Sequence, residues 1–243
     1  MSPAVRIPRM RRKLLLTGAL VLVVLLAAGT GLYVLMNSRT YQVAGRLVHR
    51  VDTADKVVAL TLDDGPSDRT SEILATLCAA GIHATFYLIG DQIAAHPDRA
   101  AAIARAGHEI GNHTYHHQRM VLITPETARA EVERTDAQIR KIGYPGPITF
   151  RPPNGKKLFA LPLYLSRHNR TTVTWDVEPD SGKHPTTDEI VTETVSKVRP
   201  GSIILLHAMY PSGASSLAAI PRIVGELRGR GYRFVTVSEL IRH

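Results

Sequence analysis

Hydrophobic and polar positions follow two different patterns along the chain. Residues 14–36 form an uncharged apolar run, which would span about 34 Å as a helix and so could cross the hydrocarbon core of a bilayer. A buried helix of a soluble protein is the alternative, but such a helix rarely lacks any charge over so long a stretch. We therefore predict one transmembrane helix at residues 14–36.

Beyond residues 37–54, which we expect to form a linker, short β-rich runs alternate with helical patterns. The predicted strands cover residues 57–64, 84–89, 109–113, 148–151, 171–177, 202–207 and 233–237. The predicted helices cover residues 68–80, 93–106, 124–142, 156–168, 187–198 and 215–230. The third helix has clear boundaries, with Thr124 as N-cap, Pro125 at the first position and Gly143 beyond the end. This alternation predicts an α/β barrel of about seven parallel strands, closed or partly open, and an open doubly wound sheet is the alternative.

The formal net charge of +9 comes almost entirely from the N-terminal region. Residues 1–50 contain eight of the 30 Lys and Arg residues and no acidic residue, which leaves 22 basic against 21 acidic residues in the remainder. A nearly neutral domain lacks the basic surface that binding to a phosphate backbone requires. We therefore expect no nucleic-acid partner.

The basic residues also predict the orientation in the membrane. Five of them precede the apolar run, so residues 1–13 are expected to stay in the cytoplasm while the C-terminal part is exported. A cleaved signal peptide is the alternative, because residues 27–29 are small enough for a processing site, and the domain would then be secreted. The apolar run continues to Met36, which favours an uncleaved anchor in the lipid bilayer, followed by the linker and one catalytic domain at residues 55–243.

Cys78 is the only cysteine, so the chain can form no intramolecular disulfide. It falls in an apolar helical pattern with Ile73, Leu74 and Leu77. We expect it to be a small buried side chain.

Polar residues gather where the predicted strands end. The first strand ends in residues 63–65, the third runs into His113 and His117, and the fourth and sixth end at Arg151 and His207. The carboxyl ends of strands in an α/β barrel meet at one rim, where active sites form. We expect these residues to share that rim.

The adjacent carboxylates of Asp63 and Asp64 would repel each other near an apolar core unless a cation or a donor holds them. A simple Asp-Gly turn is the alternative interpretation. A metal on one carboxylate and an arginine beside the other would remove the repulsion. Arg151, unless it is a surface residue, would keep Asp63 ionised and aimed.

His113 and His117 with one carboxylate would form a three-ligand site with an open position, which suits a catalytic divalent metal. Solvated loop histidines are the alternative, and His116 between them is expected to be a surface residue. The intervening residues lack the glutamate of the His-Glu-x-x-His signature, which disfavours a protease site. His207 is either a structural histidine or a candidate acid at the rim.

Taken in this order, the motifs of residues 55–243 resemble those of the polysaccharide deacetylase family. This family has the NodB-like domain of carbohydrate esterase family 4 type. The family's Thr-Phe-Asp-Asp-Gly motif is similar to residues 61–65, and its second, histidine-containing motif to residues 113–117. Its Arg-Pro-Pro-Tyr-Gly motif is similar to residues 151–155, and its apolar strand ending in Leu-x-His to residues 205–207. The resemblance implies a distorted barrel.

The resemblance also implies roles for these residues. Asp64, His113 and His117 would bind a divalent metal, most often Zn²⁺, with Co²⁺, Ni²⁺ or Mn²⁺ as alternatives. Asp63 would be the general base, and His207 would protonate the leaving amine.

Two of the motifs depart from the family pattern. Asn154, whose backbone N–H would stabilise the oxyanion, stands where the family usually has an aromatic residue. Leu205 would line the pocket for the acetyl methyl group. The family's Asp-Trp pair is missing from residues 175–182, so we expect Asp180 to orient the catalytic histidine, and Trp175 to be a sugar platform or a core residue.

The implied activity is metal-dependent deacetylation of N-acetylated amino sugars in a cell-envelope or exported polysaccharide, such as peptidoglycan, poly-N-acetylglucosamine or chitin oligomers. Removal of O-acetyl groups from a xylan-like polymer would use the same residues. A non-catalytic carbohydrate-binding relative is a further alternative, which the intact Asp63 and His207 disfavour. A non-haem iron oxygenase shares the ligand set but would more naturally have an antiparallel jelly roll.

Overall fold

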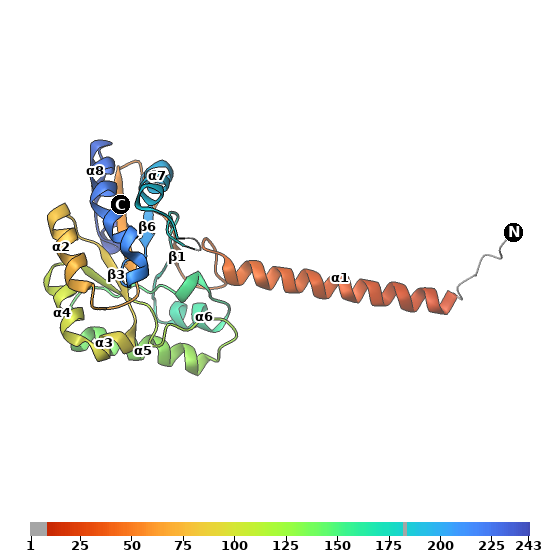
Figure 1. Cartoon of the computed structure of the whole chain (residues 1–243). Coiled ribbons are helices and arrows are strands. Elements are labelled where there is room, and N and C mark those ends of the chain that lie inside the picture. The colour runs from red at the N-terminus through yellow and green to blue at the C-terminus, as the bar shows by residue number, and fades with distance from the viewer. Residues whose placement is uncertain (1–8, 182–183) are drawn as a thin grey trace.

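Helix α1 (Arg9–Asn37) projects from the folded domain as a long rod (Figure 1). The computed structural model describes residues 9–181 and 184–243. From Met10 to Asn37 the helix is long and apolar enough to cross a membrane, and its most apolar part is not buried by the domain. This agrees with the N-terminal apolar helix predicted from the sequence.

The sheet consists of parallel strands. In the described part of the chain they are β1 (Leu47–Val48), β2 (Val57–Asp63), β3 (Thr85–Leu88), β4 (Glu109–Asn112), β5 (Thr172–Val173), β6 (Ile203–Leu206) and β7 (Arg233–Phe234). β2 pairs with β3 on one side and β6 on the other, β3 pairs with β4, and β7 pairs with the first residues of β2. β1 and β5 form a separate parallel pair. The predicted α/β fold with parallel strands is confirmed.

Helices cover the strands on the outside (Figure 1). They are α2 (Thr70–Ala80), α3 (Gly90–Ala95), α4 (Pro97–Arg105), α5 (Pro125–Lys141), α6 (Ala160–Arg167), α7 (Thr187–Lys197), α8 (Ala214–Gly229) and α9 (Val237–Leu240), with 3-10 turns at Pro153–Gly155 and Pro211–Gly213. The predicted boundary of α5 is confirmed, because the Thr124 side chain accepts a hydrogen bond from the Thr127 N–H.

Single-residue bridges complete the ring between the two sets of strands. Phe150 pairs with Asn112 on one side and with Thr172 on the other, while Val177 pairs with Ile204 of β6. The ring is therefore a distorted barrel, with ladders from β6 to β4 and isolated bridges across the remaining gap.

The predicted strand at residues 148–151 is wrong in extent, because only Phe150 makes strand-like bridges. Proline precedes this segment at position 147 and follows it at 152 and 153. Proline lacks the N–H that a ladder requires, so the pairing cannot extend beyond this short stretch.

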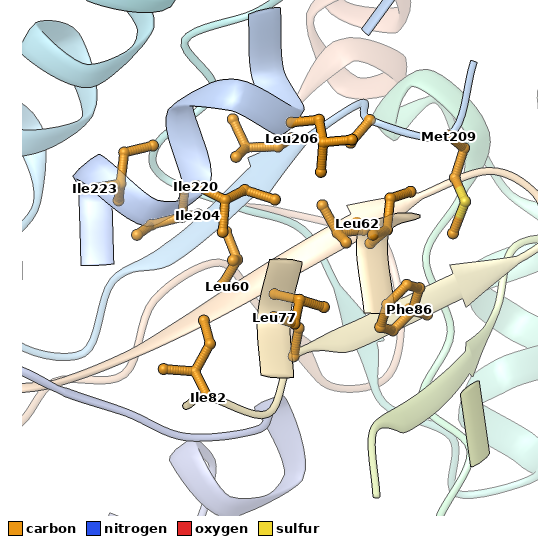
Figure 2. Close-up of a cluster of buried hydrophobic side chains, with 14 of the residues drawn as sticks. Leu60, Leu62, Leu77, Ile82, Phe86, Ile204, Leu206, Met209, Ile220 and Ile223 are labelled. Carbon is orange, nitrogen blue, oxygen red and sulfur yellow. The ribbon is translucent and has the colours of Figure 1, made fainter. Parts of the chain in front are cut away.

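Alternate residues of each strand face opposite sides of the barrel wall. Leu60 and Leu62 of β2 point outward and pack with β6, α2 and α8 (Figure 2). The odd-numbered residues of β2 point inward, where Val57 and Ala59 belong to a second cluster. The members of this inner cluster are Val48, Val57, Ala59, Tyr87, Val173, Trp175, Ile203, Leu205, Val237 and Leu240. Because this alternation continues along β2, Thr61 and Asp63 also lie inside the barrel.

The strand predicted at residues 171–177 is too long, because only Thr172–Val173 form β5 and Val177 makes an isolated bridge. Two other predicted boundaries are wrong for identifiable reasons. The predicted helix at residues 93–106 is divided into α3 and α4, because Pro97 occupies the first position of a new helix. The strand predicted at 233–237 ends at Phe234. Thr236 instead caps α9 in a capping box with Glu239.

The expected burial of Cys78 is also wrong, since its side chain is exposed. Ile73 and Leu77, four residues apart, lie on the buried face of α2. Cys78 is one residue beyond Leu77 and so points away from that face. Within residues 37–54, expected to be a linker, Leu47 and Val48 form β1 and pair with β5.

Candidate metal-dependent active site

Strand direction and alternation bring the titratable residues to the C-terminal end of the barrel. Asp63 is the last residue of β2 and faces inward, two residues after Thr61. His113 directly follows β4, and His207 directly follows β6. In parallel barrels these strand ends share one rim. The structure brings together five residues singled out in the sequence, namely Asp63, Asp64, His113, His117 and Arg151.

Asp63 and Arg151 form a buried ion pair. Nη1 of Arg151 donates to Oδ1 of Asp63 at 2.6 Å and to Oγ1 of Thr61 at 2.7 Å. The two charged side chains are 3% and 0% exposed. Arg151 also donates to the carbonyl oxygens of Val173 at 3.4 Å and Thr174 at 3.2 Å. The guanidinium therefore compensates the charge of Asp63 and fixes the direction of its carboxylate.

Asp64, His113 and His117 form a cluster in which one ligand atom of each lies within 4.8 Å of the others. Oδ1 of Asp64 is 3.3 Å from Nε2 of His117 and 3.9 Å from Nε2 of His113. This Oδ1 atom is buried but has no hydrogen-bond partner among the described residues. A buried acceptor without a partner is costly unless a cation or a proton meets it. The residues therefore fit a divalent metal with one carboxylate and two imidazole ligands.

The backbone turns sharply at two of these ligands. Asp64 has φ 75° and His117 has φ 54°, which is the left-handed region that non-glycine residues seldom adopt. At the end of β2 this turn separates two successive carboxylates, so that Asp63 contacts Arg151 while Asp64 faces the histidines. Strained backbone of this kind often occurs at functional sites.

The hydrogen bond of His113 determines which of its nitrogens is free. Its Nδ1 donates to the carbonyl oxygen of Arg151 at 2.8 Å, since a carbonyl can only accept. Nε2 then faces the carboxylates, with Oδ2 of Asp63 at 3.6 Å. Burial lowers the pKa of His113 despite these neighbouring charges. The neutral imidazole, with Nε2 unprotonated, is the form that binds metals.

His207 has a different environment, in which Asp180 is the main partner. Nδ1 of His207 is 3.1 Å from Oδ1 of Asp180, and the His207 backbone N–H donates to Oδ2 at 2.6 Å. Oγ of Ser216 donates to the same Oδ2 at 2.6 Å. Burial disfavours the imidazolium, but the Asp180 hydrogen bond and the charges of Asp63, Asp180 and Asp64 raise the pKa of His207 to about 9. The side chain is therefore protonated at neutral pH.

The remaining residues singled out in the sequence differ in exposure. Asn154 is exposed and left-handed (φ 55°), and its side chain accepts a hydrogen bond from Arg119 at 3.4 Å. Trp175 is 3% exposed and belongs to the inner cluster, which favours the core role over that of a sugar platform. Leu205 is fully buried in the same cluster. His116 is half-exposed and bonds to Glu131.

Thr61 and Ser216 contact the site but were not among the residues singled out in the sequence. Strand alternation contained the signal for Thr61, because it shares the inward face of β2 with Asp63. Ser216 lies near the start of α8, 36 residues after its partner Asp180. No local pattern connects these two positions.

Comparison with known proteins gives consistent matches. Residues 50–173 match the family model described as polysaccharide deacetylase. A peptidoglycan-N-acetylglucosamine deacetylase of Bacillus cereus is 32% identical over 205 residues, which is 82% of this chain and 94% of that protein.

Two solved structures are similar in fold. One is a peptidoglycan N-acetylglucosamine deacetylase in complex with 4-naphthalen-1-yl-N-oxidanyl-benzamide, with a TM-score of 0.76, 30% identity, and 80% of this chain and 92% of that chain covered. The other is a mutant of a family 4 carbohydrate esterase pseudoenzyme with restored activity, with a TM-score of 0.75 and 26% identity, over 82% of this chain and 72% of that chain.

Proposed function

Because this chain belongs to the polysaccharide deacetylase family, we propose that it removes acetyl groups from N-acetylated amino sugars of a cell-envelope glycan by metal-dependent hydrolysis. The observation that carries this proposal is the metal-ligand cluster of Asp64, His113 and His117. A buried carboxylate, Asp63, lies beside it, and the charges of Asp63 and Asp64 act on the protonated His207. A metal site, a base and an acid are the parts that amide hydrolysis requires.

Asp63 is the proposed general base, which takes a proton from the attacking water. Oδ1 is occupied by Arg151, so Oδ2 is the oxygen available for this proton. Arg151 is the positioning residue that holds the carboxylate in place. A divalent metal on the cluster, for which we propose Zn²⁺, would supply Lewis acidity to the acetamide carbonyl and to the water.

His207 is the proposed acid, which donates a proton to the leaving amine. Its pKa of about 9 keeps it charged at neutral pH, and Asp180 holds Nδ1 so that Nε2 is the donor. We assign the backbone N–H of Asn154 to the oxyanion and Leu205 to the acetyl methyl pocket, following the family motifs.

Peptidoglycan is the proposed natural substrate, because the Bacillus cereus relative is a peptidoglycan deacetylase. Helix α1 supports a membrane anchor at residues 14–36, with residues 1–13 in the cytoplasm. Residues 37–54, which include β1, would then connect this anchor to the remainder of the catalytic domain, proposed at 55–243, on the outer side of the membrane.

The test measures acetate release by the full-length chain in detergent from N-acetylglucosamine oligomers, peptidoglycan and acetylated xylan. A chelator should abolish release, and re-addition of Zn²⁺, Co²⁺, Ni²⁺ and Mn²⁺ in turn should identify the metal that restores it. His117→Ala should lose both bound metal and activity, because it removes one of three ligands. His116→Ala is the matched control and should retain both, since His116 bonds to Glu131 instead.

The other outcomes would each redirect the proposal. Full activity in the presence of chelator would contradict a metal-dependent mechanism. Release from acetylated xylan alone would indicate an O-acetyl esterase. Bound metal without release from any of the three substrates would indicate a non-catalytic carbohydrate-binding protein.

A further inference from the structure

The end of helix α1 is attached directly to the catalytic domain. The N–H of Lys157 donates to the carbonyl oxygen of Met36 at 3.3 Å, and Nζ of Lys157 donates to that of Ser38 at 2.5 Å. The Lys157 side chain is fully buried in this contact. The apolar run itself extends to Met36. No free linker therefore separates the proposed membrane span from the domain.

The residue that follows this attachment contacts the rim of the barrel. Arg39 pairs with Glu178 at 2.5 Å and lies over the ring of Trp175 at 4.8 Å. Its carbonyl oxygen accepts a hydrogen bond from Oγ1 of Thr174 at 2.6 Å. The anchor is thus joined to the C-terminal end of β5, and Lys157 lies just after the loop of residues 151–155. The end of α1 and the catalytic rim lie on the same side of the domain.

Large apolar side chains are exposed around this attachment. We define the seating patch as Tyr41, Leu122, Phe159 and Leu163, whose exposed fractions are 60%, 92%, 48% and 42%. The parallel bridge between Met120 and Lys157 brings the segments that carry Leu122 and Phe159 side by side.

The other two residues of the patch lie close to the same attachment. Leu163 is one turn after Phe159, to whose carbonyl oxygen its N–H donates. Tyr41 is three residues beyond Ser38, to whose hydroxyl its N–H donates. Nearby, Gly45 packs against Ser166 of α6. In Figure 1, α6 correspondingly lies beside the base of α1.

We propose that the seating patch rests on the outer surface of the bilayer and holds the catalytic rim there. The occupant is the lipid surface because the patch is continuous with the end of the proposed transmembrane helix. Aromatic and aliphatic side chains at such a position bury apolar area at the level of the headgroups. This inference rests on the proposed anchor and adds an orientation to the proposed function.

The orientation limits which glycan the site can reach. Leu122 is five residues beyond His117, so even a fully extended chain would keep the two within about 18 Å. The metal-ligand cluster is therefore close to the membrane surface. The substrate is a glycan segment next to the bilayer, either lipid-linked or in the innermost layer of the envelope.

The experiment measures the depth of fluorescent labels on the full-length chain in phospholipid vesicles. Cys78→Ser combined with Leu122→Cys carries a label on the seating patch, and Cys78→Ser with Phe159→Cys provides a second position. The native exposed Cys78 is the matched control, because α2 lies on the side of the domain away from α1 (Figure 1). Leu122 is 92% exposed, so its replacement removes almost no packing.

Phosphatidylcholine with a spin label near the headgroup should quench the labels at 122 and 159 roughly twofold, because an interfacial face lies about 5–10 Å into the headgroup boundary. The label at Cys78 should keep its fluorescence. If the chain floats with the vesicles but the labels at all three positions are quenched equally and weakly, the proposed seating is wrong while the proposed anchor stands.

Loss of the chain from floating vesicles would overturn both the anchor and the seating. Acetate release from soluble N-acetylglucosamine oligomers by the same samples tests the deacetylase proposal separately. It does not depend on the membrane, so failure of the seating and failure of the activity are distinguishable.

Discussion

Asp63 and His207 both stand at the end of a barrel strand, but Asp63 is enclosed by the barrel whereas His207 lies at its edge. The strand side of the site, Asp63 with Arg151, has side chains that are 3% and 0% exposed. The loop side of the site is Asp180 with His207. The side chain of Asp180 is 3% exposed, while that of His207 is 38% exposed. The proposed base is therefore almost fully buried, and the proposed acid is partly exposed to solvent.

The two sides use a charged partner for different purposes. A buried charge that loses its partner is strongly destabilising, so the strand side couples catalysis to the stability of the barrel. Asp180 mainly sets the protonation of His207, whose pKa is raised to about 9. We expect changes on the strand side to affect rate and stability together, and changes on the loop side to affect the pH dependence.

The largest effect is expected for Asp63→Asn. The amide can still accept a hydrogen bond from Arg151 but cannot take a proton, so acetate release should fall by about 10²–10⁴-fold, the contribution of a positioned general base. Release from N-acetylglucosamine oligomers at saturating metal checks this. Bound metal, measured in parallel, should stay at one equivalent, and undiminished release would show that Asp63 is not the base.

Arg151→Met should have the next largest effect, this time on stability. It leaves the carboxylate of Asp63 buried without a partner, which costs about 3–5 kcal/mol in the free energy of unfolding. Urea unfolding followed by circular dichroism measures the change. The double variant with Asp63→Asn should recover part of the lost stability. If Arg151→Met lowers the free energy of unfolding by less than about 1 kcal/mol, the value of an exposed pair, the Asp63 carboxylate is solvated in that variant.

Asp180→Asn should act mainly through pH. The imidazolium of His207 is the active form, so the rate falls as pH rises through its pKa. Loss of the carboxylate removes the hydrogen bond and the charge that raise this pKa, so the alkaline limb should move from near 9 to lower pH. At neutral pH, release should fall by up to about 10²-fold, the lower range for a positioned acid. A pH–rate profile tests this, and an alkaline limb at the same pH as in the native chain would exclude Asp180 as the partner that sets it.

Ser216→Ala should have the smallest effect. Asp180 keeps both of its bonds to His207 and loses one hydroxyl donor, which corresponds to about 1 kcal/mol or roughly fivefold in rate. The alkaline limb should stay close to that of the native chain in the same pH–rate profile, because the groups that raise the pKa of His207 are Asp180, Asp63 and Asp64. A loss as large as that of Asp180→Asn would instead give Ser216 a direct part in the reaction.

The strand side was accessible from local patterns, because Asp63 ends an apolar run and His113 follows another, and parallel strand ends share a rim. Local patterns also indicate the residues around Asp63. Thr61 lies on the same face of the strand, two residues earlier, and Arg151 ends a predicted strand.

The loop side and the short strands were less accessible. Ser216 approaches Asp180 only through tertiary packing of α8, for which no local pattern exists. β1 has two residues and pairs with β5, about 125 positions away, so it is too short for a hydrophobic periodicity to predict it. Cys78 shows the same limit within a helix, because an apolar residue one position from the buried face is indistinguishable by composition from one on it.

Barrel closure depends on few backbone contacts, since Phe150 and Val177 make only isolated bridges where the other strands form ladders. Arg151 spans this seam, because it donates to Thr61 and Asp63 on β2 and to the carbonyl oxygens of Val173 and Thr174 on the far side. Arg151 thus adds side-chain hydrogen bonds to the backbone ones at this join, and it also orients the proposed base. The same strand end also contacts the segment that follows the proposed anchor, since the hydroxyl of Thr174 donates to the carbonyl oxygen of Arg39, two residues after α1. The residue that orients the proposed base, the join of the barrel and the segment after the proposed anchor therefore all contact two neighbouring residues, Val173 and Thr174, at the end of β5.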